Sequence, residues 1–248
     1  MNKYIKPSCL PALTLAGGIL GLALRAWLVL AGTDERGLLV TTHPAHILVF
    51  VLTALVLAVI FLCVRPLGTL EHYQALFPNG ILSGTGCITA ALGVLWVCLR
   101  DRSMRTDTVT NVCLILGILA AGCLVAVAVC RFTQRRPTFY LHVVITLFLM
   151  VHLVSQYRLW SSEPQLQVYF FPLLSSVFLM LTAYYSAVLD AKKTSRQWFV
   201  FCNQSALFFC CISLWSDSWL FYLTMAFWMF TGLCSLDIQP PESGKEAA

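Results

Sequence analysis

Apolar residues in this chain gather in runs of about 20 residues, the length at which a helix crosses a bilayer core about 30 Å thick. Charged residues lie in short clusters between these runs. Strands of a membrane barrel would instead alternate apolar and polar residues over about 10 positions. The pattern therefore predicts helical spans, with ends uncertain by a few residues, over 10–31, 45–64, 79–99, 109–130, 138–158, 167–189, 197–215 and 218–236.

Composition supports the same interpretation. The chain has 248 residues, of which 59% are hydrophobic and 11% charged, whereas a soluble domain usually has about 25% charged residues. The fold class expected is an all-α bundle of about eight transmembrane helices, or seven if one weak run does not cross. One transmembrane domain would occupy residues 1–236, and residues 237–248 would form a short polar, disordered tail.

The distribution of positive charge predicts the orientation. Lys and Arg residues in the short loops favour one side ten to five when Arg25, which lies inside a span, is left out. The more positive side is normally cytoplasmic, which places both termini in the cytoplasm of a plasma-membrane protein. The net charge of +5 then sets topology and contacts lipid, and nucleic acid is not an expected partner.

Familiar catalytic and metal motifs are absent from the sequence. It has no GxxxxGK[ST] phosphate loop, no HExxH zinc site and no GxSxG elbow, and its 11 cysteines are scattered without a CxxC pair. None of the acidic residues lies well inside a predicted span, which argues against a carboxylate proton relay. The sequence predicts no cofactor or metal and does not favour an enzyme.

Polar residues on the fifth to seventh spans are the best candidates for lining a small ligand cavity. In the fifth span they recur within one wedge of the helix, and His142, Ser186 and Asn203 fall at a similar depth when measured from the ends of their spans. The alternative is that these groups simply hydrogen-bond between helices. The complete candidate set is His142, Thr146, His152, Gln156, Tyr185, Ser186 and Asn203.

Arg25 is a permanent charge inside the first span. An arginine at mid-bilayer costs at least about 2.5 kcal/mol, although a long side chain can reach toward the interface. Arg25 is either such a structural residue or an anchor for an anionic substrate or lipid head group.

Small residues four apart recur in three spans and predict close helix packing. Examples are Gly17 with Gly21, and Gly122 with Ala126. The partners could lie within the chain or in a second copy.

Three function classes follow, in order of preference. The first is a permease-like or small-ligand-binding protein with its site between the fifth, sixth and seventh spans. The second is an accessory or assembly subunit that binds another membrane protein or itself. The third is a membrane enzyme or redox protein.

Overall fold

The computed structural model describes residues 9–32, 43–67, 77, 79–104, 107–161, 166–191 and 196–236. The predicted tail, 237–248, lies outside these residues. The described residues form eight α-helices and one short 3-10 helix, and no strand is found among them. The helices are α1 (Leu10–Ala31), α2 (Pro44–Val64), α4 (Gly80–Met104), α5 (Thr108–Phe132), α6 (Phe139–Trp160), α7 (Phe170–Asp190), α8 (Arg196–Ile212) and α9 (Trp219–Cys234), with η2 (Leu166–Tyr169) before α7.

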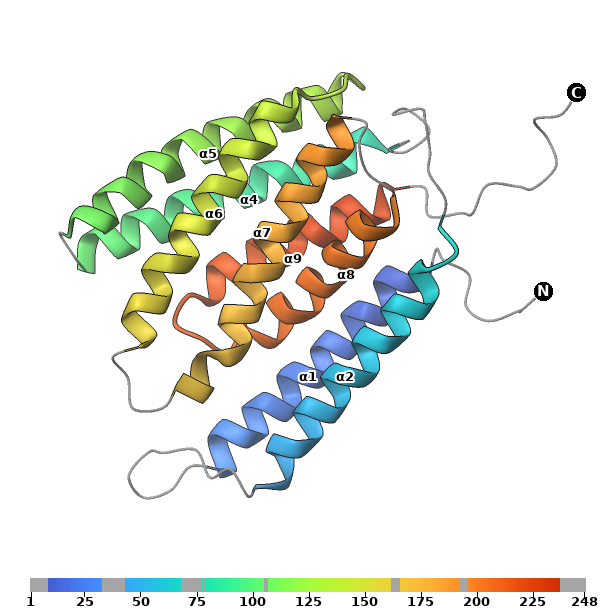
Figure 1. The fold of residues 1–248 in the computed structure, drawn as a ribbon, viewed down its shortest axis with the longest axis vertical. Helices are drawn as coiled ribbons and strands as arrows, with labels where there is room; N and C mark the ends of the chain where they lie inside the picture. The colour runs from blue at the N-terminus through green and yellow to red at the C-terminus, as the bar shows by residue number, and fades with distance from the viewer. Residues whose placement is uncertain are drawn as a thin grey trace, which may run out of the picture.

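The predicted all-α membrane bundle is confirmed. Helices α1, α2 and α4 to α7 are long and apolar enough to cross a membrane. Helices α8 and α9 have 17 and 16 residues. Successive helices run antiparallel, so α1 begins and α9 ends at the same end of the bundle (Figure 1).

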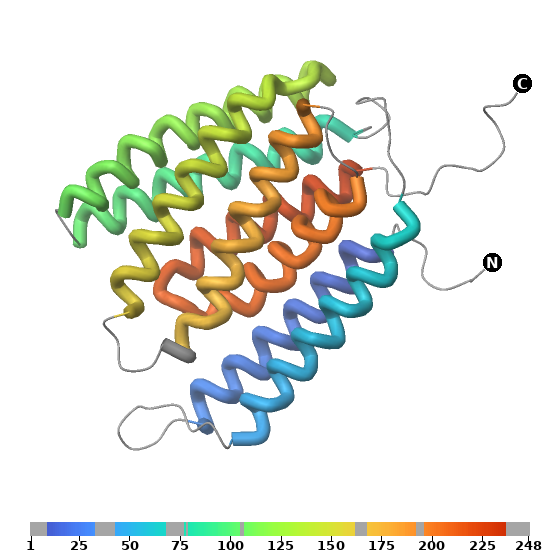
Figure 2. Tube along the Cα trace, in the orientation of Figure 1, coloured from blue at the N-terminus to red at the C-terminus, as the bar shows by residue number. Residues whose placement is uncertain are grey.

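Helices α4 to α9 form a closed ring. Each packs against the next along the chain, and α9 returns to pack against α4. Helices α1 and α2 form a hairpin outside this ring, where α1 contacts α8 (Figure 2). The ring is the feature that places side chains from six helices around one axis.

Local signals explain several helix starts. Pro44 occupies the first turn of α2, and the Nδ1 atom of His43 accepts a hydrogen bond from the backbone N–H of Ala45 at 3.3 Å. A proline fits the first turn because its missing N–H would have no helical partner there. The capping histidine satisfies one of the unpaired N–H groups of that turn.

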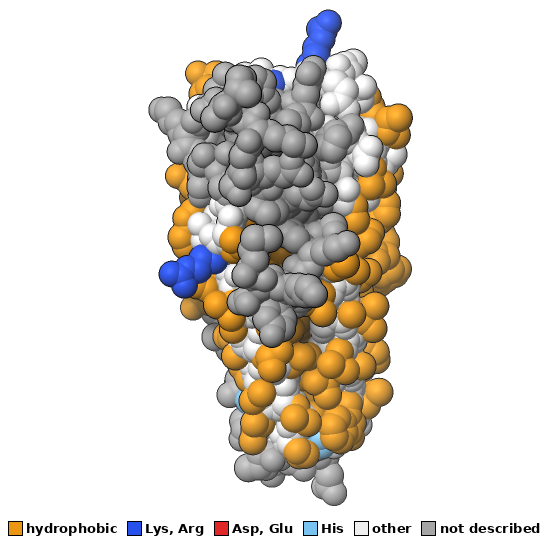
Figure 3. All heavy atoms as spheres, turned by 90° about the vertical axis from the view of Figure 1, so that its right-hand side faces the viewer, with side chains coloured by type: hydrophobic (Ala, Val, Ile, Leu, Met, Phe, Trp, Pro, Cys, Tyr) orange, Lys and Arg blue, Asp and Glu red, His pale blue; other side chains and the backbone are white. Residues whose placement is uncertain are grey.

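Large apolar side chains cover the outside of the bundle. Leu55 and Leu62 of α2 are 58% and 63% exposed, and Figure 3 shows hydrophobic side chains over much of the described part of one face. This surface suits lipid, because apolar side chains in a bilayer need no protein partner.

Glycines on α4 allow α9 to approach closely. A Cβ atom added to Gly86 or Gly93 would overlap the hydroxyl of Thr231 or Thr224. The expectation of close packing at small residues therefore holds within the chain at these positions. At Gly122 nothing lies within 4 Å of an added Cβ, so no such contact is made there within the described chain, and packing against a second copy stays a prediction.

Candidate functional site

A small cavity lies on the ring axis near the ends where α4, α6 and α8 begin. All six ring helices contribute to its wall, and its volume is about 20 Å³, enough for one water molecule. Three of the predicted residues, His142, Ser186 and Asn203, meet here as their similar depth suggested. The other residues that line it are Phe77, Ser83, Cys87, Val127, Arg131, Thr182, Phe199, Trp228, Met229 and Gly232.

A short buried contact between a histidine and an aspartate joins α6 to α7 beside this cavity. Nδ1 of His142 lies 2.7 Å from Oδ2 of Asp190, and the two side chains are only 3% and 2% exposed. Asp190 is the last residue of α7. Because it follows the predicted end of the span, nothing in the sequence predicted its burial. The Nδ1 atom of His142 thus contacts a side chain of the protein itself.

Most hydroxyls predicted to face a cavity bond to their own helix instead. Thr146 donates to the carbonyl of His142 at 2.7 Å, and Ser186 donates to the carbonyl of Thr182 at 2.7 Å. Tyr185 is half-buried and does not line the small cavity. These contacts satisfy the two hydroxyl protons locally.

His152 lies between the small cavity and the opposite end of the ring. Its Nδ1 atom is 3.9 Å from Sγ of Cys113, and its ring centroid is 5.2 Å from that of Phe221 and 5.7 Å from that of Phe148. Both phenylalanines are fully buried. The ring axis is therefore filled with side chains at this level.

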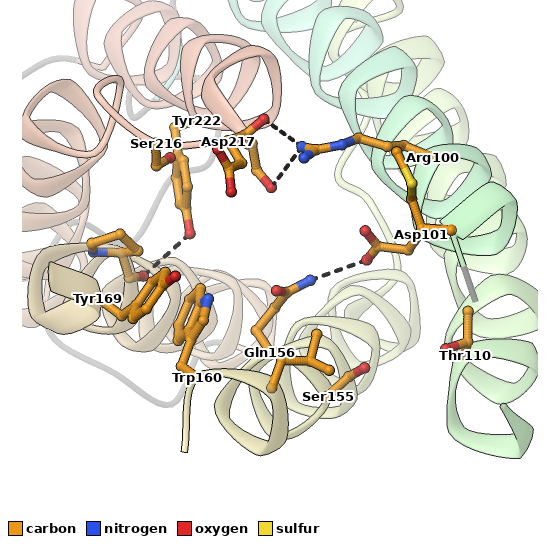
Figure 4. A pocket seen from close by; sticks show the side chains of 14 residues that line it. Arg100, Asp101, Thr110, Ser155, Gln156, Trp160, Tyr169, Ser216, Asp217 and Tyr222 are labelled. Atoms are coloured by element: carbon orange, nitrogen blue, oxygen red, sulfur yellow. Dashed lines mark hydrogen bonds between the residues drawn. The ribbon is translucent and has the colours of Figure 1, made fainter. Parts of the chain in front are cut away.

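Gln156, one turn beyond His152, faces a much larger chamber at the end where α4 and α6 finish. We call this the wide chamber; its volume is about 280 Å³. Met104 and Asp217 in its wall are exposed, so the chamber reaches the surface. It is lined by Arg100, Asp101, Met104, Thr110, Ser155, Gln156, Leu159, Trp160, Tyr169, Pro172, Ser216, Asp217, Ser218 and Tyr222 (Figure 4).

Hydrogen bonds hold the polar wall of the wide chamber in place. Nε2 of Gln156 donates to Oδ2 of Asp101 at 3.0 Å. Nη1 of Arg100 donates to the backbone carbonyl of Asp217 and, at 3.2 Å, to Oγ of Ser218. These bonds tie α4 to α6 and to the α8–α9 turn, so the wall is built from separate parts of the chain.

The wide chamber exists because α8 and α9 are short. Helix α4 has 25 residues and α8 has 17, so at 1.5 Å per residue α8 is about 12 Å shorter. Instead of continuing to residue 215 as predicted, α8 ends at Ile212. Ser216, Asp217 and Ser218 of the turn that follows line the wide chamber.

Sequence reasoning missed Arg100 and Asp101 because the apolar run ends at residue 99. No proline or glycine follows, and α4 continues through both residues to Met104. Asp101 is helical and half-buried, but it lies in the last turn of α4, so it does not contradict the prediction that no acidic residue lies well inside a span. The missing helix breaker in RDRSM was the available signal.

Arg25 lies away from the ring axis, with a side chain that is 4% exposed. It donates to the carbonyls of Ile212 at 3.2 Å and Val168 at 2.9 Å. Ile212 ends α8, where a carbonyl lacks a helical partner and a cation is favoured by the helix dipole. These contacts give Arg25 a structural role, and the anion or lipid contact stays a prediction.

Among the described residues, no group of three or more His, Cys, Asp or Glu side chains could hold a metal ion. No protein-family model, no curated protein and no solved structure matches the chain.

Proposed function

We propose that this protein is a permease-like membrane protein that binds a small polar solute in the wide chamber. The observation that carries the proposal is a polar chamber of about 280 Å³ at one end of a six-helix ring, closed on its inner side by the buried side chains of Phe148, His152 and Phe221. Binding pockets for small molecules are usually concave and carry a few fixed polar groups. This volume lies near the lower end of the usual range of about 300–1,000 Å³, which favours a solute of few atoms.

The ring axis supports a route for that solute. From Ser83 at the small cavity to Asp101 at the wide chamber, α4 advances 18 residues, which is about 27 Å at 1.5 Å per residue. The side chains of Phe148, His152 and Phe221 block the axis between them. Passage would require these side chains to separate, as the gates of alternating-access proteins do.

The proposed site differs in place from the one that the sequence predicted. Of the seven residues expected between the fifth, sixth and seventh spans, Gln156 lines the wide chamber, and Asp101 of α4 completes its contact. The positive-inside count puts the wide chamber on the outer face of the plasma membrane, with both termini cytoplasmic.

Native mass spectrometry after extraction in mild detergent tests the binding function. A retained small solute in the wild-type protein that is lost in Gln156→Leu would support it. A bare chain, or one carrying only a second protein, would favour the accessory subunit, and a visible absorption band would favour the redox alternative.

Cysteine labelling tests whether the wide chamber is open to water. In a background without the native cysteines, Gln156→Cys should react with a membrane-impermeant maleimide added to intact cells. Leu147→Cys is a matched control on the same helix, because that side chain is 44% exposed on the apolar outside and lipid suppresses thiolate formation. Equal labelling of the two variants, or labelling of neither, would refute a water-filled outer chamber.

A further inference from the structure

We infer that the small cavity is a binding site for one ordered water molecule, which hydrogen-bonds to the side chain of Asn203. This site lies apart from the proposed solute site, because Phe148, His152 and Phe221 separate the small cavity from the wide chamber. A buried acceptor atom, a space of matching size and several hydroxyl groups meet there.

Asn203 supplies a buried oxygen atom that lacks a protein partner. The residue is 3% exposed and lines the small cavity, and its Oδ1 atom has no hydrogen-bond partner among the described residues. Burying an amide group without a compensating hydrogen bond is unfavourable, and buried polar groups without a protein partner commonly bind internal water. The Oδ1 atom therefore needs a hydrogen-bond donor inside the small cavity.

The volume of the small cavity matches a single water molecule. It is about 20 Å³, and a cavity needs about 10–15 Å³ to hold one water molecule. An organic molecule of several atoms does not fit. Because side chains from all six ring helices form the wall, the packing of the whole ring fixes this space.

Hydroxyl groups around the small cavity complete the hydrogen bonds of this water molecule. The Ser186 hydroxyl donates to the carbonyl of Thr182 at 2.7 Å, and the Thr182 hydroxyl donates to the carbonyl of Phe178 at 2.8 Å. Both oxygens keep lone pairs that accept a further hydrogen bond. Ser83 of α4 also lines the cavity, is 3% exposed and adds a hydroxyl that can donate. A buried water molecule typically makes about three hydrogen bonds, and these groups with Asn203 supply that number.

A water molecule fits these groups better than a monatomic ion does. An anion only accepts hydrogen bonds, so it would leave the Oδ1 atom of Asn203 unsatisfied. A cation would lie beside the guanidinium of Arg131, which lines the same cavity, and like charges repel strongly where water is excluded. Water is uncharged and both donates and accepts, so it satisfies Asn203 without either cost.

Magnetic resonance of methionine methyl groups tests the site directly. Met229 lines the small cavity, whereas Met225, one turn earlier in α9, does not. Both residues are 1% exposed, so neither methyl group contacts bulk water. In deuterated protein with labelled methionine methyls, we expect magnetisation transfer from water to the Met229 methyl and none to the Met225 methyl. Met225→Leu and Met229→Leu, which nearly conserve side-chain volume, assign the two signals.

Filling the small cavity with a methyl group is a second test, and its predicted effect has a definite sign. Gly232 lines the cavity, and a Cβ atom added there has one neighbour within 4 Å among the described residues outside its own helix, Nδ2 of Asn203 at 3.8 Å. Replacing glycine by alanine normally stabilises a helix. In Gly232→Ala, however, the methyl group takes the space of the water and leaves Oδ1 of Asn203 without a donor, so the melting temperature in mild detergent should fall by a few degrees. Gly122→Ala is the matched control, because a Cβ added there meets nothing within 4 Å, and it should not lower the melting temperature.

The outcomes distinguish a hydrated cavity from a dry one. Transfer to the Met229 methyl alone, together with a lower melting temperature in Gly232→Ala, supports the water site. A dry cavity gives no transfer to Met229, and Gly232→Ala is then at least as stable as the wild type because its methyl group fills empty space; either result would overturn the inference. Equal transfer to Met225 and Met229 would also overturn it, because the signal would not be specific to the small cavity. Solute binding in the wide chamber is tested by other variants, so the water site and the proposed function stand or fall separately.

Discussion

Breaking the contact between His142 and Asp190 should destabilise the bundle more than removing an ordinary interhelical hydrogen bond. In His142→Leu the Asp190 carboxyl group stays buried without the imidazole, and in Asp190→Leu the imidazole stays buried without the carboxyl group. Leaving a buried polar group without its partner costs about 1–3 kcal/mol, and more when the group is charged. Polar contacts between membrane helices average about 0.6 kcal/mol, with a maximum near 1.7 kcal/mol.

The geometry decides which of these ranges applies. The contact is short, at 2.7 Å, and the side chains are 3% and 2% exposed, so bulk water does not reach either group. We therefore expect each single substitution to lower the unfolding free energy by about 2–3 kcal/mol. The double variant should lose less than the sum, because it leaves no buried polar group behind. The coupling energy of the cycle should exceed about 1.7 kcal/mol.

Equilibrium unfolding in mixed micelles with increasing denaturing detergent measures all four corners of this cycle. Thr146→Val is the control on the same helix, because its hydroxyl bonds only the preceding turn of α6, and it should cost less than about 1 kcal/mol. A coupling energy at or below about 0.6 kcal/mol would refute the reasoning. It would mean that the two groups are hydrated or that each finds another partner.

Three other predictions concern packing and topology. Gly93→Leu places a side chain on the hydroxyl of a threonine of α9 and should lower the unfolding free energy by about 1–3 kcal/mol. Gly122→Leu has open space around it and should change the unfolding free energy by less than about 0.5 kcal/mol. Equal effects would contradict the α4–α9 contact. Arg25→Ala removes two donated hydrogen bonds at the end of α8 and should lower the melting temperature without changing solute affinity, and a selective loss of affinity would revive the anion-site hypothesis. Reporter fusions after Arg136 and Arg196 should both report the cytoplasm, and signals from opposite sides would contradict eight antiparallel spans.

The apolar runs determined the fold class of this protein because a bilayer leaves little choice. Backbone groups in lipid must be satisfied within the segment, so a long apolar run must be a helix. The run predicted over 10–31 matches α1 at both ends. The predicted span ends were less accurate where a helix continues beyond its apolar residues, as α4 does through Asp101. Hydropathy indicates which residues suit lipid, but it does not show where the backbone hydrogen bonds of a helix stop.

Only the tertiary structure decided which polar residues meet. The similar depths of His142, Ser186 and Asn203 were readable along each span, and these three residues share the small cavity. The partner of His142 was not readable, because Asp190 is 48 residues away and the sequence of each span does not fix how the two helices are rotated against one another. The wide chamber was equally hidden, since it depends on the lengths of α8 and α9 relative to their neighbours and on closure of the ring, which are properties of several helices packed together.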